Sequence, residues 1–408
     1  MSIKRIAIFQ YDWPLQSYSR DLAIMFTQQG YQVDFLGYNL NVGDFISETS
    51  MFQSDLDLIQ FSTIETAYLE KNKIFYNVTN KLKFRNYKCR SNYLFNSNHI
   101  KIDRKVLLDS YHFIKKNDYA FSIGIEKQGL IWAGLIGEKL NIPAIYYSLE
   151  LYIEAHPMLQ HLGHLRPAEA YFHQQTLATI IQDKSRQKAL FEANSVDSKA
   201  VYLPVSVPGP AVLEKSDFLH KTFHINPDKK IALFFGGMAP QRYCEEIIDA
   251  AQNLRDDIVV IFHGFEMTEG YISFLKDKDF NNKVIFSLDR IPEEKLTELL
   301  SSADIGFAIY SNDNVNDRYT AFSSQKIALF LKHGLPVIAN TNESYSRLFC
   351  EFKCGRSITE KESITQAITT LCDNISIYRK EAFMAFDKYF NIDQLKSEFM
   401  TQIDEIIN

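Results

Sequence analysis

The second half of the chain alternates short apolar runs with longer segments of helical periodicity, and this alternation constrains the fold more than any other feature. Five runs rich in branched and aromatic side chains are predicted to be strands, at residues 231–235, 258–263, 284–286, 305–309 and 336–339. Helices are predicted between them, near residues 245–254, 268–276, 293–301 and 324–332. A strand that is apolar along its whole length is buried on both faces, as in a parallel sheet with helical crossovers. We therefore predict a parallel α/β domain.

The first half begins in the same way. Residues 6–9 predict a buried strand, residues 19–29 a helix and residues 33–36 a second strand. The alternation then lapses in an Asn- and Lys-rich region, residues 42–117, which we interpret as an insertion. It resumes with strands predicted at residues 120–125, 142–147, 177–182 and 201–203.

The chain is long enough for two domains, since 408 residues exceed what one hydrophobic core usually supports. The domain boundary is predicted in the segment 204–227, which contains four prolines that disfavour regular structure: Pro204, Pro208, Pro210 and Pro227. We predict a Rossmann-like domain over residues 1–204, a linker over residues 205–227 and a second Rossmann-like domain over residues 228–387. A C-terminal helix, residues 388–408, is predicted to pack back on the first domain. The fold class is thus α/β, with two Rossmann-like domains facing across a cleft.

Composition excludes several function classes. A net charge of −6 gives no general attraction to nucleic acid, and no nucleic-acid-binding module is recognisable, so no such partner is expected. The five cysteines are scattered and odd in number, which supports neither a disulfide framework nor a zinc site. Four histidines in the middle of the chain lack a metal-ligand spacing, so no metal site is expected: His156, His161, His164 and His173. No signal peptide or membrane-spanning stretch is recognisable, so we expect a cytoplasmic location.

A glycine pair follows the strand predicted at residues 231–235. In open parallel sheets, ligands bind beyond the carboxyl ends of the strands. Gly236 and Gly237 would let a ligand approach the backbone, and Arg242 offers a planar guanidinium at the start of the next helix. This outline suits a diphosphate, although a glycine pair before a helix is frequent in this fold.

A second polar segment, Ser323, Ser324, Gln325 and Lys326, opens a predicted helix. Hydroxyls and free amides at a helix start bind phosphate oxygens. The alternative is that Ser323 or Ser324 is only an N-cap, which is the commonest use of serine at that place. From these residues alone, both interpretations stay open.

The sequence around this segment resembles a known enzyme family. The pattern Ser-x-Lys-Ile-x-x-Phe-Leu-x-x-Gly-x-Pro-Val-Ile, from Ser324 to Ile338, is similar to the donor-site helix and strand of the family 4 retaining glycosyltransferases of GT-B fold. The glycine pair with Arg242 and the stretches Ala303 to Phe307 and Ile261 to Gly264 also resemble that family. The resemblance covers most of residues 228–375 in order.

The resemblance implies roles for particular positions in the second domain. Gly236, Gly237 and Arg242 would contact the pyrophosphate of a nucleotide-sugar donor. Ser323, Ser324 and Lys326 would hold it at the helix start. The donor would be a UDP- or GDP-sugar, and no metal ion would be required.

The first domain resembles the family more diffusely and would carry the acceptor side. The resemblance there rests on two stretches, Tyr146 to Glu150 and Ile181 to Arg186. It implies that Glu150 contacts the transferred sugar or the acceptor, and that Asp12, after the first strand, lies in the loop lining the cleft. Glu150 and Asp12 are the candidate catalytic residues, although either carboxylate could instead cap or pair locally.

A basic stretch in the same domain could serve the acceptor. Between Lys71 and Arg104 there are nine Lys or Arg residues and one acid, Asp103, interleaved with aromatic side chains. Residues 71–105 could rest on the inner face of a membrane, as a peripheral contact, or grip an anionic acceptor. They could equally form a solvated basic face over the insertion, and the sequence leaves these alternatives open.

The sequence also departs from the family. Its members commonly carry two glutamates eight residues apart at the donor-site helix, and the matching positions here are Ala321 and Leu329. A basic residue often found after the first glycine of the phosphate segment is replaced by Gly237. Asp313 or Asp317 could take over the sugar contacts.

The function expected from these features is transfer of a hexosyl group, with retention, from a nucleotide sugar to a glycan, a lipid-linked molecule or another acceptor. The missing glutamates support an alternative. The protein could be a catalytically inactive relative that acts as a binding or chaperone subunit.

Overall fold

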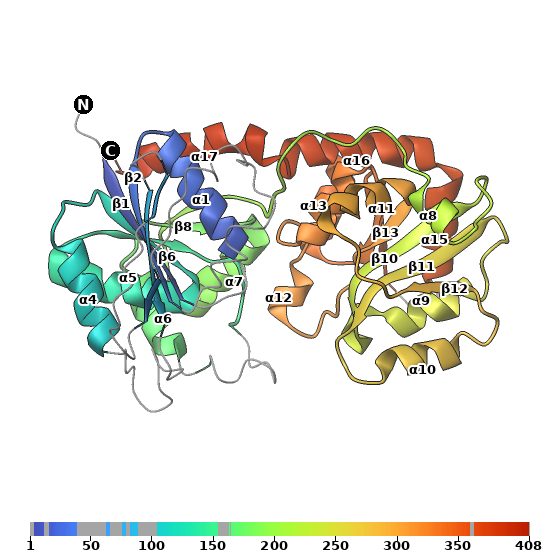
Figure 1. Ribbon diagram of the computed structural model, residues 1–408, viewed down its shortest axis with the longest axis horizontal. Coiled ribbons are helices and arrows are strands. Elements are labelled where there is room, and N and C mark those ends of the chain that lie inside the picture. Colours follow the sequence, from blue (N-terminus) through green and yellow to red (C-terminus); the bar gives the residue numbers. More distant parts are fainter. Residues whose placement is uncertain are drawn as a thin grey trace. The chain divides into compact units, whose positions relative to one another are not determined.

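The computed structural model describes residues 4–11, 16–38, 63–65, 76–78, 82–88, 104–153, 163, 165–359 and 363–407. The chain forms two compact units (Figure 1). Unit 1 comprises Met1–Leu203 and Lys396–Asn408, and unit 2 comprises Pro204–Leu395. The segment 205–227, interpreted from its prolines as a linker, belongs to unit 2 and contains the short helix α8 (Phe218–Thr222).

The described strands of unit 1 form one sheet in the order β3-β5-β2-β1-β6-β7-β8-β9, with β4 paired to β5. Only the β4–β5 pair is antiparallel among these strands. Their bounds are β1 (Arg5–Tyr11), β2 (Gln32–Tyr38), β3 (Thr63–Glu65), β4 (Tyr76–Val78), β5 (Leu82–Lys88), β6 (Phe121–Ile125), β7 (Ala144–Tyr147), β8 (Ala178–Ile181) and β9 (Lys199–Tyr202). The chain adds strands on one side of β1 and then on the other, which makes the edge at β1 and β6 a topological switch point.

Helices cover this sheet and bury its apolar strands. They are α1 (Gln16–Gln28), α4 (Arg104–Ile114), α5 (Glu126–Leu140), α6 (Arg166–His173) and α7 (Lys184–Asn194). Trp132 of α5 packs edge-on against Phe9 of β1, with ring centroids 5.2 Å apart, and its indole N–H donates to Ser110 Oγ at 3.1 Å. Asp183 caps α7, because its carboxylate accepts the amide hydrogens of Ser185 and Arg186.

Unit 2 contains a parallel sheet in the order β12-β11-β10-β13-β14-β15. Its strands are β10 (Lys230–Met238), β11 (Ile258–Glu266), β12 (Val284–Ser287), β13 (Ile305–Phe307), β14 (Val337–Asn340) and β15 (Gly355–Ile358). Its helices are η2 (Pro240–Arg242), α9 (Cys244–Ala251), α10 (Tyr271–Lys278), η3 (Glu293–Lys295), α11 (Leu296–Ser302), α12 (Val315–Arg318), α13 (Gln325–Lys332), α14 (Glu343–Glu351), α15 (Ser363–Asp373) and α16 (Ile375–Tyr389). The predicted α/β class is confirmed in both units.

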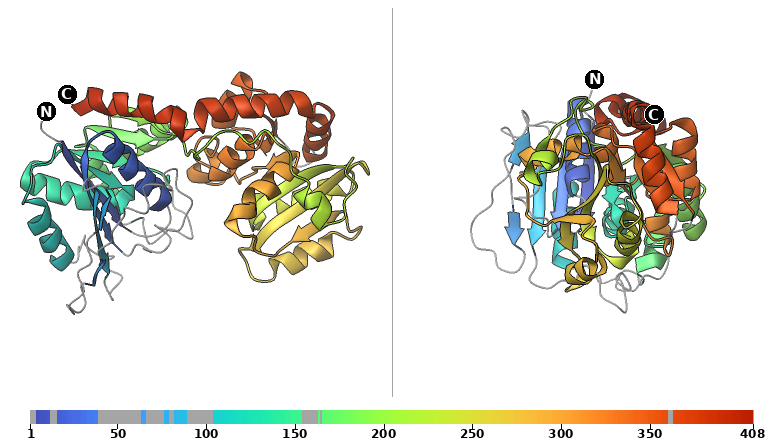
Figure 2. Two further views of the ribbon diagram at one scale, coloured as in Figure 1. Left: turned by 45° about the horizontal axis from the view of Figure 1, so that its top comes forward. Right: turned by 90° about the vertical axis from the view of Figure 1, so that its right-hand side faces the viewer.

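Helices lie on both faces of the unit 2 sheet (Figure 2), and alternate residues of β10 explain why. Ile231 and Leu233 belong to one apolar core, which α11, α13 and α16 complete. Ala232 and Phe234 belong to the other, which α9, α10 and α15 complete. A strand flanked in this way carries no polar face, which is why its sequence is continuously apolar.

The C-terminal helix α17 (Ile392–Ile407) begins in unit 2 and contributes its residues from Lys396 onward to unit 1. There Phe399 packs against Phe26 of α1 at a centroid distance of 6.3 Å. The hydroxyl of Tyr31 donates to Asp404 at 2.9 Å. The predicted return of the last helix to the first domain is therefore confirmed.

Candidate functional site

The predicted phosphate segments of unit 2 meet at the carboxyl edge of its sheet. The glycine pair is not a loop, as the sequence suggested, because β10 runs on to Met238 and pairs with β11 through Gly236 and Gly264. Gly236 and Gly264 have positive φ angles, 111° and 151° respectively. A Cβ at Gly264 would lie 2.0 Å from the carbonyl oxygen of Gly236. A Cβ at Gly236 would lie 3.8 Å from Lys326 Nζ. The strand end therefore adjoins the start of α13.

Arg242 ends the short helix η2 and lies over the ring of Tyr310. Its guanidinium carbon is 4.4 Å from the ring centroid, and its Nη1 is 3.5 Å from Asp317 Oδ1. That ion pair is long and partly exposed, so it holds the guanidinium weakly. The loop carrying Arg242 is fixed because the Ser311 amide donates to the Gln241 carbonyl at 2.9 Å.

Lys326 places a second cation against the same ring. Its ammonium is 5.4 Å from the centroid of Tyr310 and 5.0 Å from that of Phe234. Burial lowers the pKa of Lys326, and the positive charge of Arg242 acts in the same direction. Within the described part of the chain, no carboxylate pairs with this ammonium. Two cations thus share one aromatic side chain, and Asp317 is the one described carboxylate that pairs with either of them.

The paired serines hold the helix start instead of presenting it. Ser324 Oγ lies 2.8 Å from the hydroxyl of Tyr310, Ser323 Oγ donates to the Tyr319 carbonyl at 3.0 Å, and both serine amides donate to the Thr320 carbonyl. Ser324 is the N-cap residue of α13 but makes no side-chain capping bond. In the described ranges, the first amides of this helix without a backbone acceptor are those of Gln325 and Lys326. The groups available to an anion therefore lie one to two residues beyond the predicted pair.

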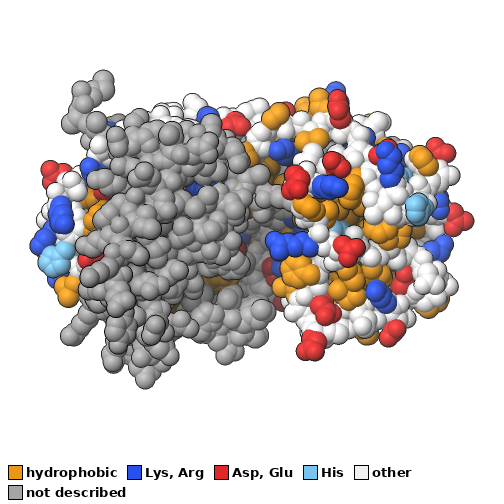
Figure 3. Space-filling view, in the orientation of Figure 1, with side chains coloured by type: hydrophobic (Ala, Val, Ile, Leu, Met, Phe, Trp, Pro, Cys, Tyr) orange, Lys and Arg blue, Asp and Glu red, His pale blue; other side chains and the backbone are white. Residues whose placement is uncertain are grey.

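Gly237 lies beside exposed apolar side chains. A Cβ there would lie 2.7 Å from the side chain of Met267, which is 49% exposed, and Phe265 on the paired strand is 64% exposed. Apolar side chains also appear between charged ones on the face of unit 2 seen in Figure 3. Gly237 thus supplies close packing at the strand end.

Ala321 and Leu329, which stand where related enzymes commonly have glutamates, pack in the apolar core of unit 2. Ala321 is fully buried in the core beneath α13, and Leu329 packs against the same core. Asp313 accepts a hydrogen bond from Ser311, while Asp317 faces Arg242 and accepts from the side chain of Asn314. Of the two aspartates considered as replacements, only Asp317 lies at the cationic site.

Glu150 lies at the carboxyl edge of the unit 1 sheet, just after β7. Its amide donates to Glu126 Oε1 at 3.0 Å, and the amide of Leu149 donates to the same oxygen at 2.6 Å. The neighbouring Leu149 carbonyl accepts from the buried guanidinium of Arg186 at 2.6 Å. The other predicted catalytic residue, Asp12, lies outside the described residues.

Glu126 is a residue that the sequence analysis did not single out. It follows β6 directly and has a left-handed backbone with φ 59°, which is costly for a residue with a side chain and is often found at functional sites. Burial raises the pKa of Glu126 to about 7, and the negative charge of Glu150 adds to this effect. A carboxylate directly after a predicted strand was the available signal.

No three His, Cys, Asp or Glu side chains gather as metal ligands among the residues that the structure describes. None of its described helices combines the length and apolar character needed to cross a bilayer.

Comparisons with known proteins show the fold. No family model and no curated sequence matches the chain. The structure resembles Anabaena HepE in complex with UDP, with a TM-score of 0.68 and 11% identity over 99% of this chain and 100% of that one. It also resembles sucrose-phosphate synthase from Thermosynechococcus elongatus, with a TM-score of 0.66 and 12% sequence identity over 99% of both chains. A third similar structure is a glycosyltransferase from Rickettsia africae, with a TM-score of 0.65 and 12% sequence identity over 100% of each chain. The chain therefore has the GT-B fold, with two Rossmann-like domains.

Proposed function

We propose that this protein transfers a sugar from a nucleoside-diphosphate sugar to an acceptor, and that the diphosphate binds at the carboxyl edge of the unit 2 sheet. One observation carries the proposal. Arg242 and Lys326 both lie against Tyr310, beside the free amides at the start of α13, and among the described side chains only the carboxylate of Asp317 pairs with either of them. A pair of linked phosphates is the ligand class that such a cluster recognises best.

The same arrangement suits the chemistry of sugar transfer. When the glycosidic bond breaks, negative charge builds on the departing diphosphate. Donors already in place stabilise that charge more than water does, because they need no reorganisation. Arg242 would form the two-pronged contact and displace Asp317, while Lys326 would act as a point charge. We propose no resident metal ion, since two side-chain cations already serve the leaving group.

Glu150 is proposed to contact the transferred sugar or the acceptor from unit 1, with Asp12 as a second carboxylate. Glu126 would position Glu150, because one of its oxygens holds both amides of the turn after β7. UDP-sugars are the first donors to test, since the similar protein HepE has been solved with UDP and with UDP-glucose.

Calorimetric titration with UDP, GDP and ADP tests the diphosphate site. Arg242→Ala should weaken binding of the preferred nucleotide roughly 10- to 100-fold, because a charge-assisted bond to phosphate contributes about 1.5–3 kcal/mol. Arg255→Ala is the matched control, since Arg255 is an arginine of the same unit whose ion pairs with Asp257 and Asp373 are exposed. The proposal fails if no nucleotide binds, or if the two variants bind equally well.

A second function, binding without turnover, is favoured by the core positions of Ala321 and Leu329, where the related enzymes commonly have carboxylates. Incubating the protein with the bound nucleotide sugar and lipid or glycan extracts separates the two. Release of nucleoside diphosphate with a glycosylated product supports transfer. Binding with no turnover, together with copurification of an active transferase, supports the subunit role.

A further inference from the structure

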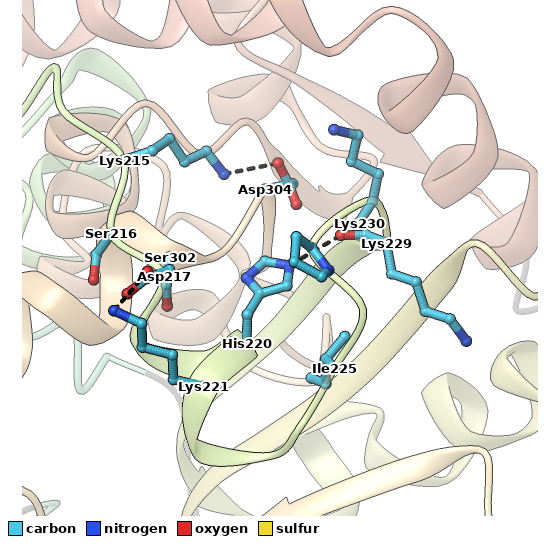
Figure 4. Close-up of a pocket in the computed structure, with 11 residues that line it drawn as sticks. Lys215, Ser216, Asp217, His220, Lys221, Ile225, Lys229, Lys230, Ser302 and Asp304 are labelled. Atoms are coloured by element: carbon cyan, nitrogen blue, oxygen red, sulfur yellow. Dashed lines mark hydrogen bonds and ion pairs between the residues drawn. The ribbon is translucent and has the colours of Figure 1, made fainter.

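A second concave site lies at the opposite, amino edge of the unit 2 sheet. It is a cavity of about 710 Å³ beside α8, lined by the residues that lead into β10 and β13 (Figure 4). Lys230 begins β10, whereas Gly236 stands near the other end of the same strand. Six residues of extended chain span about 20 Å, so this cavity is separate from the diphosphate site.

The cavity carries more positive charge than its acids can balance. Four lysines line it, together with two aspartates. Lys215 pairs with Asp304 at 2.7 Å, and Lys221 pairs with Asp217 at 2.8 Å. These pairs occupy both carboxylates.

Both oxygens of Asp304 already have partners. Its second oxygen accepts the amide hydrogen of Ile231 at 2.9 Å, and Lys215 also donates to the carbonyl of Ala303 at 2.5 Å. The aspartate therefore joins the starts of β10 and β13 and serves the fold. Among the described residues, Asp304 forms no ion pair with the other lysines of the cavity.

Those remaining lysines are Lys229 and Lys230. Over the described residues, neither forms an ion pair, and the nearby Asp257 is already bound by Arg255 at 3.0 Å. In Figure 4 the two side chains extend in different directions, and their flexible four-carbon stems allow each ammonium group to turn toward the cavity.

The positive surplus acts on the neighbouring groups. Burial lowers the pKa of Lys215, Asp304 opposes this, and the charges of Arg379 and Lys230 lower the pKa further. A bound anion would relieve this repulsion between like charges.

His220 adds a polar group in the middle of the cavity (Figure 4). Its Nε2 lies 3.1 Å from the carbonyl oxygen of Lys229, and because a carbonyl only accepts, Nε2 carries the hydrogen. The backbone just before His220 is held in place, since the Leu219 amide donates to Ser302 Oγ at 3.3 Å. The floor of the cavity is thus held by hydrogen bonds, and two lysines with flexible side chains line its edge. This arrangement suits a small anionic molecule that also carries polar groups.

We propose that this cavity binds a phosphorylated small molecule, whose phosphate group is held by Lys229 and Lys230. The volume is within the range of sites for small organic ligands, about 300–1,000 Å³. The charge surplus selects an anion, and ammonium groups are common phosphate ligands. The site is independent of the proposed sugar transfer.

Calorimetry on the full chain tests this site with inorganic phosphate and with glucose 6-phosphate, using glucose as the neutral comparison. The titrations use the Arg242→Ala/Lys326→Met background, so that phosphate bound at the other edge of the sheet does not contribute. We expect saturable binding of at least one phosphate probe and none of glucose. Tighter binding of glucose 6-phosphate than of inorganic phosphate would identify an organic phosphate as the ligand, and equal binding would identify the free anion.

Lys229→Gln/Lys230→Gln should weaken phosphate binding at least tenfold. The matched control is Lys353→Gln/Lys380→Gln, which removes the same charge from two exposed lysines of unit 2 outside the cavity. Thermal melts of both double variants check that the unit remains folded. Absence of saturable phosphate binding, or an equal loss in the two double variants, would overturn the proposal. Neither result bears on nucleotide binding, which the separate Arg242→Ala titration tests.

Discussion

At the scale of single residues, Tyr310 organises the cationic site of unit 2. Its ring faces Arg242 and Lys326, its hydroxyl lies 2.8 Å from Ser324 Oγ, and its amide donates to Asn340 at 3.0 Å. Tyr310 therefore joins the segment after β13 to the end of β14 and to the start of α13, and its ring supports both cations. Its ring and its hydroxyl have separate roles, which two substitutions can distinguish.

Tyr310→Phe removes the hydroxyl and keeps the ring. We expect unfolding free energy to fall by about 1 kcal/mol, because the buried Ser324 hydroxyl loses its partner, while nucleotide affinity stays within roughly threefold. Tyr310→Ala removes the surface on which both cations rest and should weaken nucleotide binding at least about tenfold. Equal nucleotide affinities for the two variants, measured by calorimetry, would contradict this division of roles.

Glu126 predicts a pH dependence of the stability of unit 1. Burial raises the pKa of Glu126 from 4.5 to about 7, so the native state binds its proton more tightly than the unfolded chain does. The stability from this group is complete below pH 4.5 and is lost as the pH rises through 7, by roughly 1–3 kcal/mol. Glutamine can accept the same two amide hydrogens and has no proton to lose.

Glu126→Gln should therefore match the wild type near pH 5 and exceed its unfolding free energy at pH 8. Urea titration followed by tryptophan fluorescence measures this in unit 1, because Trp13 and Trp132 are the only tryptophans of the chain. A variant with the same pH dependence as the wild type would show that Glu126 is not the group responsible.

The sequence predicted the kinds of residue at the phosphate site better than their roles. Arg242 and Lys326 lie together as expected, because cations after parallel strands converge at one edge of the sheet. The hydroxyls of Ser323 and Ser324 were expected to face phosphate, and they instead bond Tyr319 and Tyr310. Tyr310 could not be foreseen because its role depends on tertiary contacts that no local motif encodes.

At the scale of elements, the paired ends of β10 and β11 depend on two glycines. Gly264→Ala would place a Cβ 2.0 Å from the backbone oxygen of Gly236, at a φ of 151°. We expect a loss of about 3 kcal/mol or more in unit 2, since backbone atoms cannot move aside cheaply. Nucleotide affinity should fall with it, because Gly236 adjoins Lys326.

Gly270→Ala is the control for this effect. Gly270 also has a positive φ, 79°, but a Cβ there would meet nothing within 4 Å. Gly270→Ala should lower the unfolding free energy only by the backbone strain of a left-handed alanine, about 1–2 kcal/mol. Differential scanning calorimetry measures both variants. Similar melting temperatures would mean that the close approach of the two strands does not limit stability.

Most strands and helices of the second unit could be predicted from the sequence, because its central strands are buried on both faces and are therefore short apolar runs separated by helical segments. The ends of the strands were harder to predict from the sequence. β10 was expected to end at residue 235 because glycines usually mark turns, but Gly236 and Gly264 continue the ladder side by side. The strand β15 was missed because Gly355–Ile358 contains arginine and serine, and pairing with β14 sets its place.

At the scale of the whole molecule, the chain returns to its first unit through its last helix. Phe399 is 1% exposed and packs on α1, while Asp404 accepts the hydrogen bond of Tyr31. The core of unit 1 is thus completed only by residues from the opposite end of the chain. The sequence predicted both this helix and its return to the first domain, but not the contacts of Phe399 and Asp404, which depend on tertiary packing.

Phe399→Ala tests this dependence. A buried phenylalanine replaced by alanine typically costs about 3–5 kcal/mol, so unit 1 should unfold at a clearly lower urea concentration. Tryptophan fluorescence reports this directly, since both tryptophans lie in unit 1. Thr401→Ala on the same helix is the control, because Thr401 is exposed and bonds only its own helix at Ser397. If both variants unfolded at the same urea midpoint, α17 would cover unit 1 without stabilising it, and its return would have to serve another purpose.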